Sequence, residues 1–182
     1  MKKKLLTLMV MCFINASNGC FAADALNKQD CATSYNQDCT VSYGYVSVGV
    51  GPSILMPSIG TGYRTRNYSR GVDSSLRLST IGILHVAQVN VSMLQYLRPN
   101  SVQSYYWGVG PACSFICDNS SLKYSDLLFS PSLVFGKERL EDDGLRGFSE
   151  FSFQSPHFLI RKGKVRHATN IPAVYYRYGV CF

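Results

Sequence analysis

The chain has 182 residues, of which 46% are hydrophobic and 16% charged, and its formal net charge is +7. A mean hydropathy of +0.01 with this composition excludes a disordered chain and a bundle of membrane-spanning helices, yet it fits strands that alternate apolar and polar residues. Three basic residues lie at positions 2–4, and without them 15 basic residues remain against 11 acidic ones. This excess predicts no dedicated nucleic-acid surface, and the length fits one domain.

Residues 1–23 are typical of a cleavable export signal. A basic start and an apolar run at 5–14 precede small residues that offer cleavage points, Ala22, Ala23 and Ala25. The apolar run is too short to span a bilayer as a helix. Cys20 suggests a lipoprotein signal, but Ser17 stands where such signals carry leucine, so we favour cleavage without lipidation.

The next segment, 24–40, is polar and lacks apolar periodicity, which predicts an irregular periplasmic lead-in. Five cysteines follow the leader, and an exported chain meets an oxidising compartment in which thiols can pair. Cys31 and Cys39 would close a small loop, or stay unpaired. A bridge between Cys113 and Cys117 requires a tight turn, because an extended strand holds their α-carbons too far apart. No cysteine or histidine spacing indicates a zinc site, and we expect no metal and no cofactor.

From residue 41 onward, short runs alternate between two kinds of side chain and are separated by turn residues. Seven such runs cover 41–51, 58–66, 71–80, 85–97, 104–115, 127–138 and 145–155. Successive side chains of a strand point to opposite faces, so each run has one apolar face and one face rich in glycine and serine. The run 85–97 is the clearest of the early ones, with Val89, Val91 and Met93 alternating with Asn90 and Ser92.

The eighth run, 173–182, ends on the last residue of the sequence given. One parity is apolar or aromatic throughout: Val174, Tyr176, Tyr178, Val180 and Phe182. A terminal phenylalanine after alternating apolar residues resembles the closing strand of bacterial outer-membrane β-barrels, which the assembly machinery of that family reads as an insertion signal. The resemblance, to the small barrels of the outer-membrane protein A and X type, implies that residues 41–182 form an all-β, eight-stranded antiparallel up-and-down transmembrane barrel. It also implies localisation in the outer membrane after export to the periplasm.

Period two alone does not say which face is inside, because a soluble lipocalin-like barrel and a membrane barrel have opposite polarity. The side chains of the polar parity are mostly those of glycine and serine, which are small enough to fit inside a narrow eight-stranded lumen. It also carries charges for which we predict lumenal ion pairs: Asp73, Arg77, Glu138, Glu150 and Arg177. Aromatic residues near the strand ends predict interfacial belts: Tyr43, Tyr63, Tyr96, Tyr105, Trp107 and Tyr176. We therefore expect lipid outside, and a soluble exported lipocalin-like binding barrel or a β-sandwich is the alternative.

With both termini in the periplasm, the two longest links, 116–126 and 156–172, lie outside the cell. The second link carries a candidate anion-binding loop for lipopolysaccharide phosphates or sulfated sugars, made of Arg161, Lys162, Lys164 and Arg166. A solvated loop whose charge aids solubility is the simpler interpretation.

For function, the resemblance implies a structural or surface-interaction role, such as envelope integrity or adhesion, with a closed lumen and no catalysis. The implied partners are outer-membrane lipid, lipopolysaccharide, the assembly machinery and a host or envelope surface ligand. An ion path through the lumen and a lipid A-modifying enzyme are the alternatives. The enzymes need a histidine beside a serine, and Ser79 with His85 is the one pair worth testing here.

Overall fold

The computed structural model describes residues 40–51, 56–81, 84–99, 101–118, 126–140, 145–155, 158–161, 164–167 and 172–182. The expected signal peptide and lead-in, with Cys20, Cys31 and Cys39, lie outside these ranges, except that Thr40 already belongs to the first strand. Within the described ranges no helix is long and apolar enough to cross a membrane.

The described residues form ten strands. In chain order these are β1 (Thr40–Gly51), β2 (Met56–Asn67), β3 (Arg70–Ile81), β4 (Leu84–Tyr96), β5 (Gln103–Asp118), β6 (Asp126–Leu140), β7 (Arg146–Gln154), β8 (Phe158–Arg161), β9 (Lys164–His167) and β10 (Ala173–Cys181).

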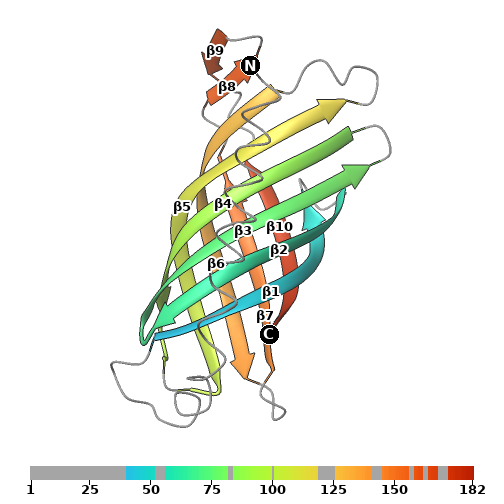
Figure 1. Cartoon of the computed structure of the whole chain (residues 1–182). Helices are drawn as coiled ribbons and strands as arrows, with labels where there is room; N and C mark the ends of the chain where they lie inside the picture. The colour runs from blue at the N-terminus through green and yellow to red at the C-terminus, as the bar shows by residue number, and fades with distance from the viewer. Residues whose placement is uncertain are drawn as a thin grey trace.

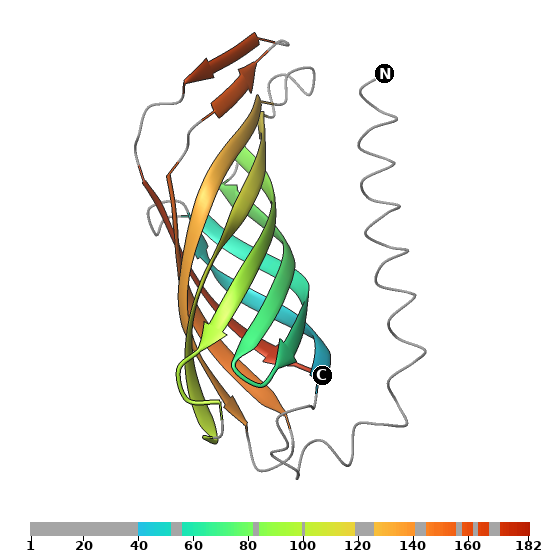
Figure 2. The ribbon, with the colours of Figure 1, turned by 90° about the vertical axis from the view of Figure 1, so that its left-hand side faces the viewer.

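Eight of these strands close into one antiparallel barrel, as the alternating runs predict. Strands β1 to β7 pair in chain order, and β10 pairs with both β7 and β1. The strands are strongly tilted against the barrel axis (Figures 1 and 2), as closure of a small sheet requires. We call the end with the β2–β3 turn and the C-terminus the terminal end, and the opposite end, from which β8 and β9 project, the hairpin end.

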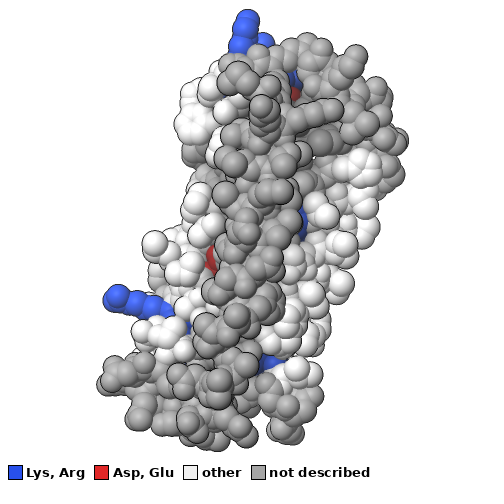
Figure 3. All heavy atoms as spheres, viewed as in Figure 1, with Lys and Arg blue, Asp and Glu red and all other residues white. Residues whose placement is uncertain are grey.

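Side chains are distributed inside out compared with a soluble barrel. On β10, Tyr178 is 49% exposed, and Phe182, which follows the strand, is 54% exposed. Tyr175 and Arg177 are on the opposite parity, point into the lumen and are buried. The other strands repeat this pattern, with valine, leucine and phenylalanine outside and serine, glutamine, arginine and carboxylates inside. The part of the wall that is not grey in Figure 3 is mostly uncharged. The lipocalin-like alternative, which needs an apolar interior, is therefore wrong.

Glycines make room for the large side chains that do point inward. Tyr45, Tyr106 and Phe148 each lie directly across the strand pair from a glycine, namely Gly62, Gly136 and Gly179. A Cβ atom at any of these glycines would collide with the opposite ring. The rings therefore lie over the bare backbone of the neighbouring strand, which lets an eight-stranded lumen contain aromatic side chains.

The long link before the closing strand is not entirely irregular, because β8 and β9 form a small hairpin within it. Strand β7 ends at Gln154, in register with Ser132 of β6, so the earlier part of β6 has no β7 partner. Strand β8 pairs with Leu127–Phe129 of β6 instead and covers that exposed edge.

Two expectations are wrong. Cys113 is a free thiol, because β5 continues as an extended strand through Cys117 and makes no tight turn there. Tyr43 and Tyr96 are not part of an interfacial belt, because both are buried in the lumen. Tyr105 and Trp107 do lie on the outer surface.

Candidate functional site: a buried ionic network

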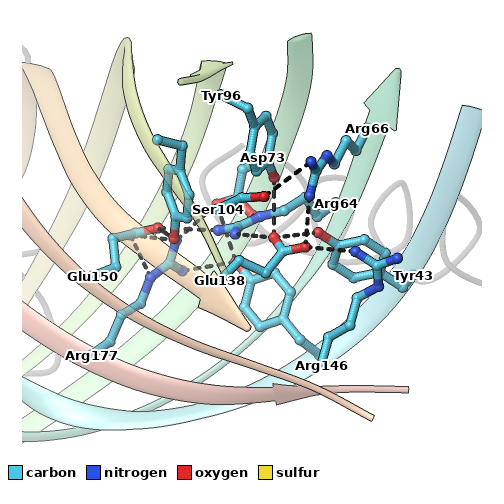
Figure 4. A network of polar contacts seen from close by, with 12 residues as sticks. Tyr43, Arg64, Arg66, Asp73, Tyr96, Ser104, Glu138, Arg146, Glu150 and Arg177 are labelled. Carbon is cyan, nitrogen blue, oxygen red and sulfur yellow. Dashed lines mark hydrogen bonds and ion pairs between the residues drawn. The ribbon is translucent and has the colours of Figure 1, made fainter. Parts of the chain in front are cut away.

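A network of charged and aromatic side chains crosses the lumen (Figure 4). It lies toward the terminal end, because Arg66, Glu138 and Arg146 are each within two residues of a strand end on that side. Its centre is Arg64 of β2, whose side chain is 0% exposed. Antiparallel pairing places Arg64 directly opposite Asp73 of β3, and Nε of Arg64 lies 3.0 Å from Oδ1 of Asp73. The two terminal nitrogens reach Glu150 at 3.1 Å and Glu138 at 3.4 Å. One guanidinium thus contacts all three carboxylates that the structure describes in the lumen.

A second arginine, Arg177 of β10, joins two of the same carboxylates. It lies 2.6 Å from Glu150, its register partner on β7, and 2.9 Å from Asp73. Its Nη1 also donates to the hydroxyl of Tyr45 at 2.8 Å, and this hydroxyl donates to Asp73 at 3.1 Å. Every nitrogen of Arg177 therefore has an acceptor, as a buried guanidinium requires.

Glu138 of β6 anchors the part of the network closest to the terminal end. Its Oε1 accepts from Arg146 at 2.9 Å and from Arg66 at 3.4 Å. The hydroxyl groups of Tyr43 and Tyr96 donate to its Oε2 at 2.7 Å and 3.1 Å. This carboxylate links β1, β2, β4, β6 and β7 across the lumen.

Aromatic rings fill the remaining space around the charges. The guanidinium carbon of Arg64 lies 4.7 Å from the ring centre of Tyr106 and 4.8 Å from that of Phe148. Arg66 lies 4.0 Å above Tyr96. Together with the ion pairs, these cation–π contacts form a plug that connects strands on every side of the barrel.

Four of the five charges expected in the lumen, Asp73, Glu138, Glu150 and Arg177, belong to this network. Arg77 is also buried, but it makes no ion pair with any described carboxylate and lies over the ring of Tyr175 at 4.8 Å. Sequence reasoning missed Arg64, Arg66 and Arg146 as network members. The alternation of the sequence does indicate their direction. Arg64 and Arg66 have the same parity as Gly60 and Gly62, which face inward, and Arg146 has the same parity as Glu150.

The candidate anion-binding residues lie on or next to the β8–β9 hairpin. Arg161, Lys164 and Arg166 are exposed, and Lys162 lies outside the described residues. Arg161 pairs with Asp126 at 3.5 Å. The hairpin thus presents two exposed cations without a described carboxylate partner, Lys164 and Arg166.

The Ser79–His85 pair is not assembled. Ser79 faces the lumen and is buried, whereas His85 is exposed and its Nδ1 lies 2.9 Å from Oγ1 of Thr80. In the described part of the chain no group of three or more histidine, cysteine or acidic residues could hold a metal ion.

No protein-family model matches the chain, and no curated protein matches it by sequence. Solved structures do match it. Neisserial surface protein A is similar over 79% of this chain and 98% of its own, with a TM-score of 0.59 and 8% sequence identity. The N-terminal β-barrel domain of OprF from Pseudomonas aeruginosa is similar over 78% of this chain and 96% of its own, with a TM-score of 0.54 and 11% identity.

The chain has the fold of a small eight-stranded outer-membrane barrel. At these identities the likeness defines the fold alone, and the role of this barrel has to be argued from its own residues.

Proposed function

We propose that this chain is an outer-membrane barrel with a closed lumen, whose role is structural or surface-interacting rather than catalytic or conducting. The observation that carries the proposal is the combination of an apolar outer wall with the Arg64-centred plug inside it. An apolar wall of this extent is stable in contact with lipid and unstable in contact with water. Three buried carboxylates held by arginines join opposite walls and stiffen a narrow barrel.

In this proposal an export signal takes the chain to the periplasm, and the outward residues of 174–182 direct assembly. The hairpin end then faces the outside, and the terminal end faces the periplasm. The β8–β9 hairpin supports this orientation, since long extracellular links and short periplasmic turns are typical of such barrels. Outer-membrane lipid and lipopolysaccharide are the expected surroundings.

A closed lumen predicts an electrical result. We expect the refolded protein to give no steady current in a planar lipid bilayer, because the plug crosses the lumen at the level of Arg64 and Glu138. A wide porin recorded in the same bilayer serves as the control for membrane quality. Regular single-channel steps from the refolded protein would support an ion path and contradict a closed lumen.

The surface-interaction part of the proposal rests on the hairpin. Lys164 and Arg166 are exposed beside Arg161, and basic groups in this position suit the phosphates of lipopolysaccharide or the sulfates of a surface sugar. A host or envelope ligand bearing such groups is the kind of partner that this hairpin fits.

The hairpin prediction is tested by changing its four basic residues, Arg161, Lys162, Lys164 and Arg166, to serine. We expect binding to immobilised heparin or lipopolysaccharide to fall about tenfold, since each lost exposed contact contributes about 0.2–1 kcal/mol. The matched control removes four exposed basic residues from the terminal end: Arg70, Arg98, Lys137 and Arg139. Equal loss in both variants would indicate a general effect of net charge, and unchanged binding in the hairpin variant would end this part of the proposal.

A further inference from the structure

Among the described lumenal arginines, Arg77 is the one that the plug leaves out. Five described arginines point into the lumen, against three carboxylates, and the other four all contact those carboxylates. The Arg77 side chain is only 7% exposed, and its Nη1 has no hydrogen-bond partner. A buried guanidinium with no ion-pair partner among the described residues and with an unused donor is unfavourable, so a compensating group is expected beside it.

The residues directly around Arg77 are small or uncharged. Glu150 attracts its guanidinium and Arg177 repels it, but no described carboxylate lies within ion-pair distance of it. Its register partners are Gly60 on β2 and Gln88 on β4, and its neighbours on the same face of β3 are Ser75 and Ser79. Gly60 has no side chain, and the two serines have small ones. An eight-stranded lumen is wide enough to hold one small ligand beside its own side chains.

Three further buried atoms of the described residues have no partner: Oδ1 of Asn90 on β4 and the hydroxyl groups of Ser132 on β6 and Ser152 on β7. Ser152 is the register partner of Tyr175, the ring that Arg77 covers. Ser132 is the register partner of Gln154, which accepts a hydrogen bond from Gln88 at 2.7 Å. The unused hydroxyl groups of Ser132 and Ser152 thus lie next to the layer of the lumen that holds Arg77 and Gln88, and no described atom of the plug is among the unpartnered ones.

We propose that this layer binds one small inorganic anion of about the size of chloride, held by the guanidinium of Arg77 and by serine hydroxyls, Ser152 first among them. Water molecules would satisfy the N–H groups but leave the positive charge uncompensated. A cation is excluded by the charge of Arg77, and a large organic anion is excluded by the width of the lumen. The bound anion lowers the excess of positive charge among the described lumenal residues from two to one, and it does so independently of the exposed hairpin.

The test is the salt dependence of unfolding. The protein, refolded in neutral detergent micelles, is unfolded with urea in sodium chloride and in sodium gluconate at equal ionic strength, with Trp107 fluorescence as the readout. We expect a higher midpoint in chloride. Once the site is mostly filled, the unfolding constant should fall about tenfold for each tenfold rise in chloride, as expected for one site present only in the folded state.

Arg77→Met should abolish the difference between the two salts, while Arg70→Met, an exposed control, should keep it. Bromide provides a second measurement on the unaltered protein, because anomalous scattering from bromide-containing crystals should place a peak within hydrogen-bond distance of the Arg77 guanidinium. Equal midpoints of the unaltered protein in both salts, an undiminished difference in Arg77→Met, or water alone at the guanidinium would overturn the proposal. This bromide result also decides the matter if Arg77→Met does not fold.

Discussion

Replacement of Arg64 by methionine is expected to lower the free energy of unfolding of the barrel by about 3–5 kcal/mol, the range for breaking a buried ion pair by removing one partner. Arg64 contacts Asp73, Glu138 and Glu150. Its loss would leave three buried carboxylates with fewer positive partners and would empty the space between the rings of Tyr106 and Phe148. Arg64→Lys should recover only part of the loss, because one ammonium group does not reach three carboxylates at once.

The measurement is urea unfolding in detergent micelles, followed by the fluorescence of Trp107, the single tryptophan. Arg70→Met, at the exposed start of β3, is the matched control and should change the free energy of unfolding by less than about 0.5 kcal/mol. If Arg64→Met unfolds at the same urea concentration as the unaltered protein, the plug does not stabilise the barrel.

The second large effect is expected at Gly179 of β10. A methyl group there would meet the ring of Phe148 and lie 2.8 Å from the carbonyl oxygen of Val46. We expect Gly179→Ala to destabilise the barrel by about 1–3 kcal/mol, as overpacking of a filled core does. The same unfolding assay measures it, with Gly44→Ala as the control, because the Cβ at Gly44 meets only the ring of the terminal Phe182, at 3.2 Å.

A double-mutant cycle separates the ring from the backbone. In a Phe148→Leu background the smaller side chain relieves the clash with the ring but not that with the carbonyl. The Gly179→Ala change should therefore be milder there by at least about 0.5 kcal/mol, the usual scale of coupling between residues in contact. Strict additivity of the two changes would contradict the pairing of inward rings with opposite glycines.

Much of this architecture follows from period two in the sequence. The eight barrel strands, the outward direction of Tyr178 and Phe182, and the inward direction of Asp73 and Glu150 are all fixed by parity once lipid is placed outside. Parity does not give register, and register decides which charges meet. The position of Arg64 among three carboxylates depends on pairings with β3, β6 and β7 that no local pattern encodes.

The direction of the aromatic side chains is the other feature that the sequence pattern alone does not predict. Tyr43 and Tyr96 lie near strand ends, where a ring can serve an interface or fill the lumen, and their side chains alone do not distinguish the two. The glycine across the strand pair is the distinguishing feature for rings such as Tyr45 and Phe148, and it is recognised only when neighbouring strands are aligned. The β8–β9 hairpin was missed for a similar reason, since it forms to cover an edge of β6 that only the folded barrel exposes.

The central claim is that lipid surrounds the apolar wall, and Trp107 tests it directly. This residue is the only tryptophan, lies on the outer face of β5 and is 41% exposed. In vesicles, lipids brominated on their acyl chains should quench most of its fluorescence, while aqueous iodide should quench little. Strong quenching by iodide with none by the brominated lipids would place water at this wall and contradict a membrane barrel.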